Sequence, residues 1–344
     1  MAKSSNPLPE EYTIEDAFEA SVRMSSIETY LKKAIYGREQ AVCALLYAVT
    51  TGENLMLDGQ HGLAKSMLAD HFFKCLDPEI NTFKKQLSRA TDPEELFGAF
   101  NLKRYKEDAI YEYNVENFLP TAHFGYLDEV YRGSDKLLPT LMSLLNEREF
   151  KNGTEILKCP LITTIGTTNF ITETNDLEAF NDRWLFHVKV APIPENEVFQ
   201  MLKSVEGNDA DIEEVQPFRL RDIRALQFIL KNLTFKDNFL TMFAKFLKQF
   251  VKVVAPGAYI SDRRKLQTLA ILRLAYISEV FGDDSIAEED ITFDSEYFDI
   301  DATSRHAMAS LMTAQYGLMQ VGNPEKDSQY ESFVRDFVAT EKVA

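Results

Sequence analysis

A glycine-rich turn, Gly59-Gln-His-Gly-Leu-Ala-Lys-Ser66, is the part of the sequence best suited to chemistry. A phosphate-binding loop has a glycine, four further residues and then Gly-Lys followed by Ser or Thr. Its backbone amides hold phosphates, its lysine reaches the terminal phosphates, and its hydroxyl binds magnesium. The competing interpretation is a chance glycine-rich turn before a helix. The residues predicted to bind a nucleotide here are Gly59, Gln60, His61, Gly62, Leu63, Ala64, Lys65, Ser66 and Met67.

Within this loop, Lys65 is also a predicted catalytic residue and Ser66 a predicted magnesium ligand. Ala64 replaces the last glycine of the pattern. Alanine fits the helical backbone of a first turn well, so this replacement is mild provided that the position does not need positive φ.

Two adjacent acids, Asp128 and Glu129, follow the apolar run Phe124-Gly-Tyr-Leu127. At the end of a strand, Asp128 would hold magnesium and Glu129 would orient or deprotonate an attacking water. Solvated acids at a strand end are common and form the alternative. Because this strand follows Lys65 by about sixty residues and belongs to the same predicted sheet, the catalytic interpretation is favoured.

Three further polar positions are weak evidence for a nucleotide site when each is taken alone. Asn169 ends the next predicted strand, where it would help Glu129 hold the water, although asparagine is also common in turns. Arg183 precedes the last strand and would stabilise charge on a transferring phosphoryl group, which would belong to a neighbouring subunit if the side chain points outward. Ser261 is a helix cap, after which Arg263 or Arg264 would reach back to the phosphates. Solvated surface arginines are the alternative for both sites.

The elements that must position these residues alternate between strand and helix. Apolar runs predict strands at residues 54–58, 82–87, 123–129, 161–166 and 185–190, and helical patterns lie between them. Residues 99–114 look hairpin-like, and Lys151-Asn-Gly153 predicts a two-strand turn. This alternation predicts a doubly wound α/β domain with a parallel sheet.

After Pro192 and Pro194 the strand signals vanish, and the pattern becomes helical up to about Phe281. We therefore expect a smaller, all-helical lid domain after the α/β domain. The predicted division is a polar leader at 1–12, the α/β domain at 13–192, the lid at 193–290 and a C-terminal segment at 291–344. From Gly322 onward we expect a mobile tail with a short helix near residues 330–338.

Composition narrows the class of protein. The chain has 37 Lys and Arg against 54 Asp and Glu, a formal net charge of −17, which disfavours non-specific binding to nucleic acid. Its three cysteines are scattered and its histidines show no ligand spacing, so we expect reduced thiols and no zinc site. No apolar run approaches the length of a membrane span. We expect a cytoplasmic protein without membrane insertion.

Taken together, these motifs resemble the AAA+ superfamily and, within it, the MoxR family, most closely its RavA-type members. The similarity extends over residues 35–279. Beyond the ATPase motifs, it includes Thr91-Asp-Pro-Glu-Glu-Leu-Phe-Gly98, Leu145-Asn-Glu-Arg-Glu-Phe-Lys-Asn-Gly153 and Gly257-Ala-Tyr-Ile-Ser-Asp-Arg-Arg264. Gln60 and His61 depart from it, because many relatives have prolines there.

The resemblance implies a role for each matching residue. Lys65 and Ser66 resemble Walker A, Asp128 and Glu129 resemble Walker B, and Asn169 resembles sensor 1. Arg183 is similar to an arginine finger, and Arg263 to sensor 2. Tyr36 and Gly37 stand where the family's adenine pocket begins. Residues 99–114 and 149–159 resemble inserts that face the pore or the partner in ring-forming members.

The function that the resemblance implies is hydrolysis of ATP with Mg²⁺, coupled to remodelling of a protein partner by a homo-oligomer, expected to be a hexamer. The expected partner carries a von Willebrand factor A domain, and the segment after Asp290 could be a partner-docking element. One alternative is a scaffold that binds ATP and assembles but hardly hydrolyses it. A nucleic-acid motor is the other, and the charge of −17 disfavours it.

Overall fold

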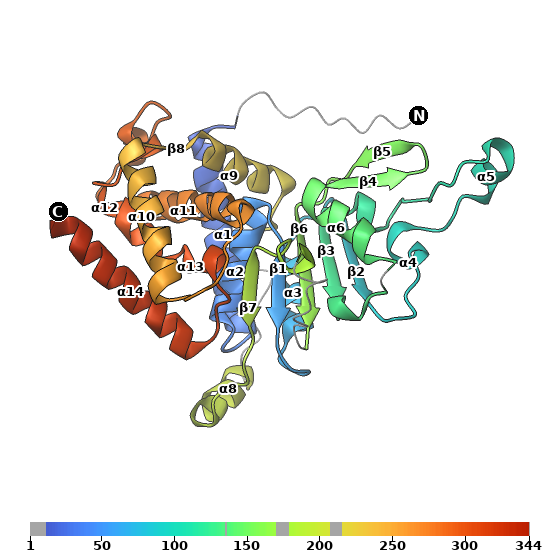
Figure 1. Ribbon diagram of the computed structural model, residues 1–344, viewed down its shortest axis with the longest axis horizontal. Helices are drawn as coiled ribbons and strands as arrows, with labels where there is room; N and C mark the ends of the chain where they lie inside the picture. The colour runs from blue at the N-terminus through green and yellow to red at the C-terminus, as the bar shows by residue number, and fades with distance from the viewer. Residues whose placement is uncertain (1–11, 135, 170–178, 207–214, 344) are drawn as a thin grey trace.

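The computed structural model describes residues 12–134, 136–169, 179–206 and 215–343 of the 344-residue chain. Its centre is a five-stranded sheet with the strand order β2-β3-β6-β1-β7 (Figure 1). Every pairing between these strands is parallel. The strands are β1 (Leu55–Asp58), β2 (Thr82–Gln86), β3 (Phe124–Asp128), β6 (Thr163–Thr168) and β7 (Phe186–Lys189).

Helices cover both faces of this sheet. The helices of the first half are α1 (Ile14–Ala34), α2 (Glu39–Thr51), α3 (Lys65–Lys74), α4 (Glu94–Phe97), α5 (Leu102–Asp108) and α6 (Leu138–Glu147). Leu55 and Leu57 of β1 belong to one apolar cluster with α1, α2 and α3, whereas Met56 belongs to a second cluster with α4 and α6. Since successive side chains of a strand point to opposite faces, a continuous apolar run is what a strand covered on both sides requires. The predicted doubly wound α/β fold is confirmed.

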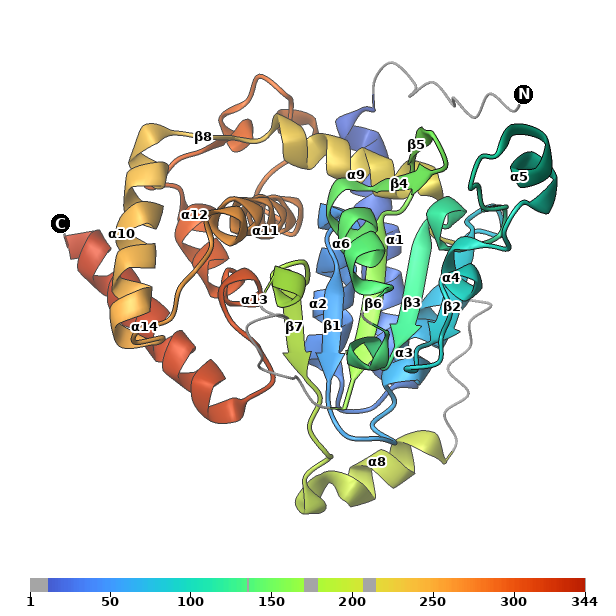
Figure 2. The same ribbon diagram turned by 45° about the vertical axis from the view of Figure 1, so that its right-hand side comes forward.

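Two insertions project from the β2–β3 side of the sheet, where Figures 1 and 2 show α5 farthest from the centre. One is the predicted hairpin of β4 (Glu149–Asn152) and β5 (Glu155–Lys158), which are antiparallel. In the other, Phe100 and Tyr113 form an antiparallel bridge, as the hairpin-like pattern suggested, but α5 occupies the tip. Asn152 joins the two, because its side chain accepts from the amide of Tyr113 at 2.7 Å and donates to the carbonyl of Tyr113 at 3.0 Å.

The second half of the chain is mainly helical, as predicted. Its elements are α8 (Val198–Val205), α9 (Leu220–Asn232), β8 (Thr234–Phe235), α10 (Asp237–Val253), α11 (Asp262–Phe281), β9 (Asp299–Ile300), α12 (Arg305–Ala309), α13 (Gln315–Leu318) and α14 (Pro324–Val343). Short 3-10 helices lie at Leu119–Thr121, Val130–Arg132, Glu195–Glu197, Glu288–Asp290, Glu296–Phe298 and Ser310–Met312. Buried apolar side chains of α9, α10, α11 and α14 belong to the same cluster as α1 and α2. None of the helices in the described ranges is long and apolar enough to cross a membrane.

The C-terminal stretch differs from the prediction. Instead of a mobile tail with a short helix near residues 330–338, the chain forms one helix, α14, of 20 residues. Three aromatic residues of α14, Tyr330, Phe333 and Phe337, pack around Phe246 of α10 with ring centroids 6.3, 5.1 and 5.1 Å away. The tail looked polar because its buried apolar residues, this aromatic stripe and Val334, occupy one face of the helix. Their partner Phe246 lies 84 residues before Tyr330 in the chain.

Replacing Phe337 with alanine is expected to lower the free energy of unfolding by about 3 kcal/mol, because its buried ring leaves a cavity against Phe246. Urea denaturation of the purified chain measures the change. Arg335→Ala on the exposed side of the same helix is the control, and it should change stability by less than about 0.5 kcal/mol. Equal effects of the two substitutions would show that α14 is not packed on α10.

Candidate functional site

The strand order brings three of the predicted motifs to one edge of the sheet. In a parallel sheet the carboxyl ends of the strands lie together, and ligands bind beyond them. β6 lies between β1, which leads into the glycine-rich loop, and β3, which ends at Asp128. Asn169, the residue after β6, therefore stands between the loop and the two acids.

Lys65 is 9 % exposed, and its ammonium group faces inward. Its Nζ donates to the carbonyl oxygens of Gly59 and Gln60, the latter at 3.0 Å, and to Oδ1 of Asn169 at 3.1 Å. Burial lowers the pKa of Lys65, an effect opposed by the negative charges of Glu129 and Asp128. The lysine thus uses carbonyl oxygens of its own loop as hydrogen-bond acceptors.

Glu129 is 4 % exposed and adopts the left-handed conformation, with φ of 55°. A non-glycine residue in this conformation costs free energy and is found where function or packing demands it. One oxygen, Oε1, accepts from Nδ2 of Asn169, while the other lies 3.4 Å from Nε of Arg132. Asn169 therefore bridges Lys65 and Glu129, and its Nδ2 also lies 2.8 Å from Nε2 of the exposed His61.

The residues suit a magnesium ion of the kind that phosphate substrates bring with them. Mg²⁺ prefers oxygen ligands and takes only one or two from the protein, with water and phosphate completing its shell. Asp128 is a carboxylate fixed by a hydrogen bond from the hydroxyl of Thr167, and Ser66 presents an exposed hydroxyl at the start of α3. These two oxygens come from the loop and from the acidic strand, so the donor set fits the group.

Ala64 does not have the helical backbone that would make it a mild replacement. Its φ is 62° and its ψ is 19°, in the left-handed region, as the residue before the first turn of α3. Gly62 is also at positive φ, +79°. The loop therefore needs the glycine-type conformation at position 64 and imposes it on an alanine, at a cost of about 1 kcal/mol.

The substitution Ala64→Gly is expected to raise the free energy of unfolding by roughly 0.5–1 kcal/mol, since glycine adopts this conformation without steric cost. Thermal or urea denaturation checks the sign. Ala270→Gly, inside α11, is the matched control and should lower stability by about 1 kcal/mol. If both substitutions destabilised the protein equally, position 64 would not be strained.

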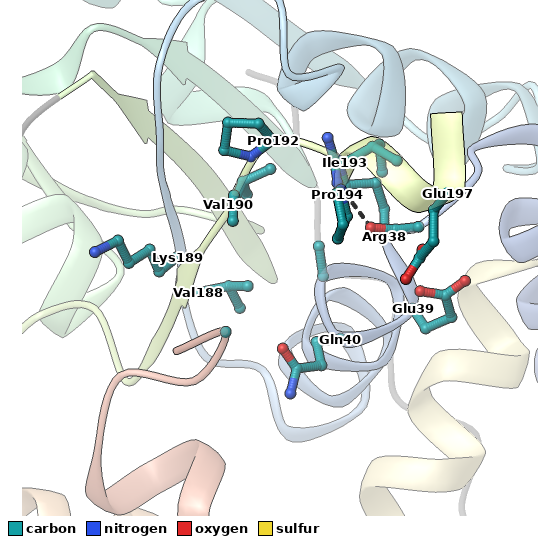
Figure 3. A pocket seen from close by; sticks show the side chains of 14 residues that line it. Arg38, Glu39, Gln40, Val188, Lys189, Val190, Pro192, Ile193, Pro194 and Glu197 are labelled. Atoms are coloured by element: carbon teal, nitrogen blue, oxygen red, sulfur yellow. Dashed lines mark hydrogen bonds between the residues drawn. The ribbon is translucent and has the colours of Figure 1, made fainter. Parts of the chain in front are cut away.

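Beside the loop lies a cavity of about 260 Å³, lined by the start of α2, the end of β7 and the chain that follows it. Figure 3 shows Val188 and Val190 on one side, Arg38 and Glu39 on the other, and Gln40 between them. The cavity adjoins the loop, because Nε of Arg38 donates to the carbonyl of Leu63 at 3.2 Å. Of the two residues predicted to begin a base pocket, Gly37 lines the cavity, whereas Tyr36 is not among its lining residues.

Close packing at the start of the loop explains why position 59 is a glycine. A Cβ on Gly59 would lie 2.3 Å from the carbonyl oxygen of Val190. The amide of Gly59 donates to Thr168 at 3.1 Å, so the loop leaves the sheet between the ends of β6 and β7. Cavity and loop are therefore joined, as the base and phosphates of one nucleotide would require.

The predicted arginines lie elsewhere. Arg183 precedes β7, and its carbonyl accepts from the side chain of Asn54, just before β1. It is therefore at the amino ends of the strands, opposite the loop. Since a strand rises about 3.3 Å per residue, the length of β1 alone puts roughly 13 Å between the two edges.

Arg263, the other arginine predicted to reach the phosphates of a nucleotide, lies on the same side of the sheet as Arg183. The start of α11 is docked on the residue before Arg183, because the hydroxyl of Ser261 donates to Asp182 at 2.9 Å. Arg263 is consequently near Arg183, and burial together with the charge of Arg263 lowers the pKa of Arg183. Nε of Arg183 and Nη1 of Arg263 are buried and have no hydrogen-bond partner among the described residues.

Arg264, the alternative to Arg263, has a structural position. Its guanidinium donates to the carbonyls of Trp184 at 2.9 Å and of Leu185 and Gly317 at 3.1 Å. Nε of Arg264 also lies 3.9 Å from Oδ1 of Asp182. With these contacts Arg264 holds α11 and α13 on the start of β7. Arg264 is thus fully engaged in structural contacts, whereas Nη1 of Arg263 has no hydrogen-bond partner in the described part of the chain.

Sequence reasoning missed two residues of the site. Thr167 orients Asp128, and Arg132 pairs with Glu129. The only signals were their positions, two residues before Asn169 and three residues after Glu129. Polar residues so placed are too common for a prediction without the strand order.

Comparison with known proteins gives the same fold and a family. A family model described as the MoxR domain in MoxR-vWA-beta-propeller ternary systems matches residues 22–227. An uncharacterised protein of Methanocaldococcus jannaschii is 30 % identical over 271 residues, which are 78 % of this chain and 69 % of that protein. Chaperone MoxR1 of Mycobacterium tuberculosis is 24 % identical over 208 residues, 58 % of this chain and 53 % of its own.

Among solved structures, a candidate ATPase of Cytophaga hutchinsonii has the same fold, with a TM-score of 0.59 and 17 % identity. The alignment covers 76 % of this chain and 81 % of that one. The strand order, with β6 inserted between the loop strand and the acidic strand, and the glycine-rich loop define a P-loop protein of the AAA+ class. Within that class the chain belongs to the MoxR family.

Proposed function

We propose that this chain hydrolyses ATP with Mg²⁺ at sites shared between subunits of a ring and uses the energy to remodel a protein partner. The observation that carries the proposal is the separation of two incomplete sets of groups. Lys65, Asn169 and Glu129 form one connected set at the loop edge of the sheet, while Arg183 and Arg263 lie at the opposite edge. No single subunit can close the distance between them.

Each residue at the loop edge has a separate role in phosphoryl transfer. Backbone amides from Gly59 to Ser66 and the ammonium of Lys65 hold the phosphates. Ser66 and Asp128 would hold magnesium, which would supply positive charge at the phosphate oxygens. Glu129 orients or deprotonates the attacking water, and the amide of Asn169 keeps its carboxylate in place. The cavity beside Gly37 takes the base.

The arginine edge supplies what the loop edge lacks. Arg183 and Arg263 are neighbouring cations, and a phosphate would offset the repulsion between them by accepting hydrogen bonds from both. Because their own loop is at the far edge, the phosphates belong to the next subunit. Such a head-to-tail contact is heterologous and closes into a ring when its rotation permits. A hexamer is the size expected for it.

The insertions are the proposed contact with the partner. Leu102, Tyr105 and Tyr111 of the α5 insertion and Ile156 of the β4–β5 hairpin are exposed, with exposed fractions of 62, 41, 64 and 64 %. Rings of Phe100, Tyr105 and Tyr111 lie within 5.5 Å of one another. Exposed aromatic groups of this kind mark protein contact sites. The matched family model is described for systems with a vWA protein, which supports a partner of that class.

Substituting Glu129 with glutamine is expected to lower ATP turnover by at least about 100-fold while ATP still binds, because the amide cannot accept the proton. Steady-state phosphate release and equilibrium ATP binding measure the two effects. Glu331→Gln, on α14, should leave both unchanged. Unchanged turnover in Glu129→Gln would remove Glu129 from catalysis. Assembly with ATP but without turnover in the wild type would favour the scaffold alternative.

Mixing two inactive variants tests the shared site. Arg183→Ala and Lys65→Ala should each lose more than about 99 % of turnover. An equimolar mixture should recover about a quarter of the wild-type rate, because one in four interfaces has both an intact loop and an intact arginine. A mixture of Lys65→Ala with Glu129→Gln is the control and should stay inactive, since both changes lie in the same half-site. Absence of recovery in the first mixture would contradict the shared site.

The effect of duplex DNA on ATP turnover tests the remaining alternative, a nucleic-acid motor. Turnover stimulated by duplex DNA and falling steeply with salt would indicate a nucleic-acid motor. The assignment to RavA-type members and a cytoplasmic location also remain predictions from the sequence.

A further inference from the structure

The base cavity has a wall that comes from the far end of the chain. Val321 adds a single bridge to the outer edge of β7, with its amide donating to His187 at 3.0 Å and its carbonyl accepting from Lys189 at 2.8 Å. Gly322, the next residue, lines the cavity. We call residues 320–327 the closing segment. It lies outside residues 22–227, the part matched by the MoxR family model.

The closing segment fits tightly. A Cβ on Gly322 would lie 2.2 Å from the carbonyl oxygen of Lys189, and Gly322 has φ of +91°. Nε2 of Gln320 lies 3.4 Å from Oδ2 of Asp58, the last residue of β1 before the loop. The segment is thus attached both to β7 and to the strand that leads into the phosphate site.

Asp327 connects the segment with Gln40, a residue that lines the cavity from α2. Oδ2 of Asp327 accepts from Nε2 of Gln40 at 3.1 Å and from the amide of Gly322 at 3.0 Å. Asp327 is 8 % exposed, and its Oδ1 is buried without a hydrogen-bond partner among the described residues. A carboxylate so placed needs donors nearby.

This contact decides which end of the Gln40 amide is available to a ligand. An aspartate carboxylate only accepts hydrogen bonds, so the NH₂ group of Gln40 must face Asp327. The carbonyl oxygen of Gln40 is the group that remains, and Gln40 lines the cavity between the residues of β7 and Arg38 (Figure 3). Gln40 therefore presents a hydrogen-bond acceptor to the cavity, and this acceptor suits a ligand that has a hydrogen-bond donor at the same point.

We propose that Gln40, oriented by Asp327 of the closing segment, selects a purine with an amino group at C6 over one with an oxo group. This inference rests on the proposed nucleotide site and specifies which base that site takes. Adenine presents an N–H donor to the oxygen of Gln40, whereas guanine presents a second acceptor and leaves both oxygens unpaired. Because Asp327 belongs to α14, recognition of the base also depends on the docking of the C-terminal helix.

Binding of the non-hydrolysable nucleotides AMP-PNP and GMP-PNP, measured by titration calorimetry with magnesium, tests the proposal without relying on hydrolysis. The wild type should bind AMP-PNP at least about tenfold more tightly than GMP-PNP. In Gln40→Leu the acceptor is absent, so the two affinities should approach each other. In Asp327→Asn the new amide can accept or donate, Gln40 is free to reverse, and the preference should shrink although the size of the side chain is kept.

Displacing the closing segment is a second test. Gly322→Ala should weaken AMP-PNP binding by about tenfold, because its Cβ cannot fit against Lys189. Gly257→Ala is the matched control: Gly257 is also at positive φ, +79°, but a Cβ there meets nothing within 4 Å. Its AMP-PNP affinity should be that of the wild type.

The outcomes separate this inference from the function on which it rests. Equal affinities of the wild type for the two nucleotides, or an unchanged ratio in both Gln40→Leu and Asp327→Asn, would overturn the role of Gln40 and leave the ATPase intact. Failure of the wild type to bind either nucleotide would overturn the proposed function, and this inference with it.

Discussion

The buried ammonium group of Lys65 is the feature around which the loop edge is arranged. A cation removed from water needs acceptors, and Lys65 finds them in Gly59, Gln60 and Asn169. Asn169 then turns its NH₂ group to Glu129, which also lies beside Arg132. The order of the strands makes this possible, since only a residue after β6 can reach both neighbours. A phosphate bound to Lys65 would compete with Oδ1 of Asn169 for the ammonium group. Because the same side chain holds Glu129, binding at Lys65 would also affect the position of Glu129.

The same sheet keeps the two halves of the proposed reaction apart. Its carboxyl edge carries the loop and the acids, and its amino edge carries Arg183 and, through the docked start of α11, Arg263. A parallel strand cannot offer both ends to one ligand. Each chain therefore carries the two sets of groups at opposite edges of its sheet, and the proposed head-to-tail assembly would bring the sets of neighbouring chains together.

Local patterns predicted the features that depend on neighbours in the sequence. The run Leu55-Met-Leu57, the loop after it and the acids after β3 were recognisable because strand periodicity and loop chemistry are short-range. The conformation of Ala64 was not, since φ there is imposed by the loop as a whole. The packing of α14 and the contact between Gln40 and Asp327 join residues far apart in the chain, and a polar helix or a lone glutamine carries no signal of them. Arg263 and Arg264 are adjacent residues of the same type, so the sequence gives them the same prediction. Only their contacts in the folded chain distinguish their roles.

The bridge formed by Val321 has a consequence for the behaviour of the protein at high concentration. An open sheet exposes unpaired backbone groups at its two outer strands, which can pair with another molecule and begin aggregation. Here the outer side of β7 is covered by Val321 and Gly322, and the opposite strand, β2, carries Lys84 and Lys85, each in an ion pair. Both margins are therefore poor templates for strand addition. The proposed assembly of several copies would therefore form through folded surfaces and not through edge-to-edge pairing of their sheets.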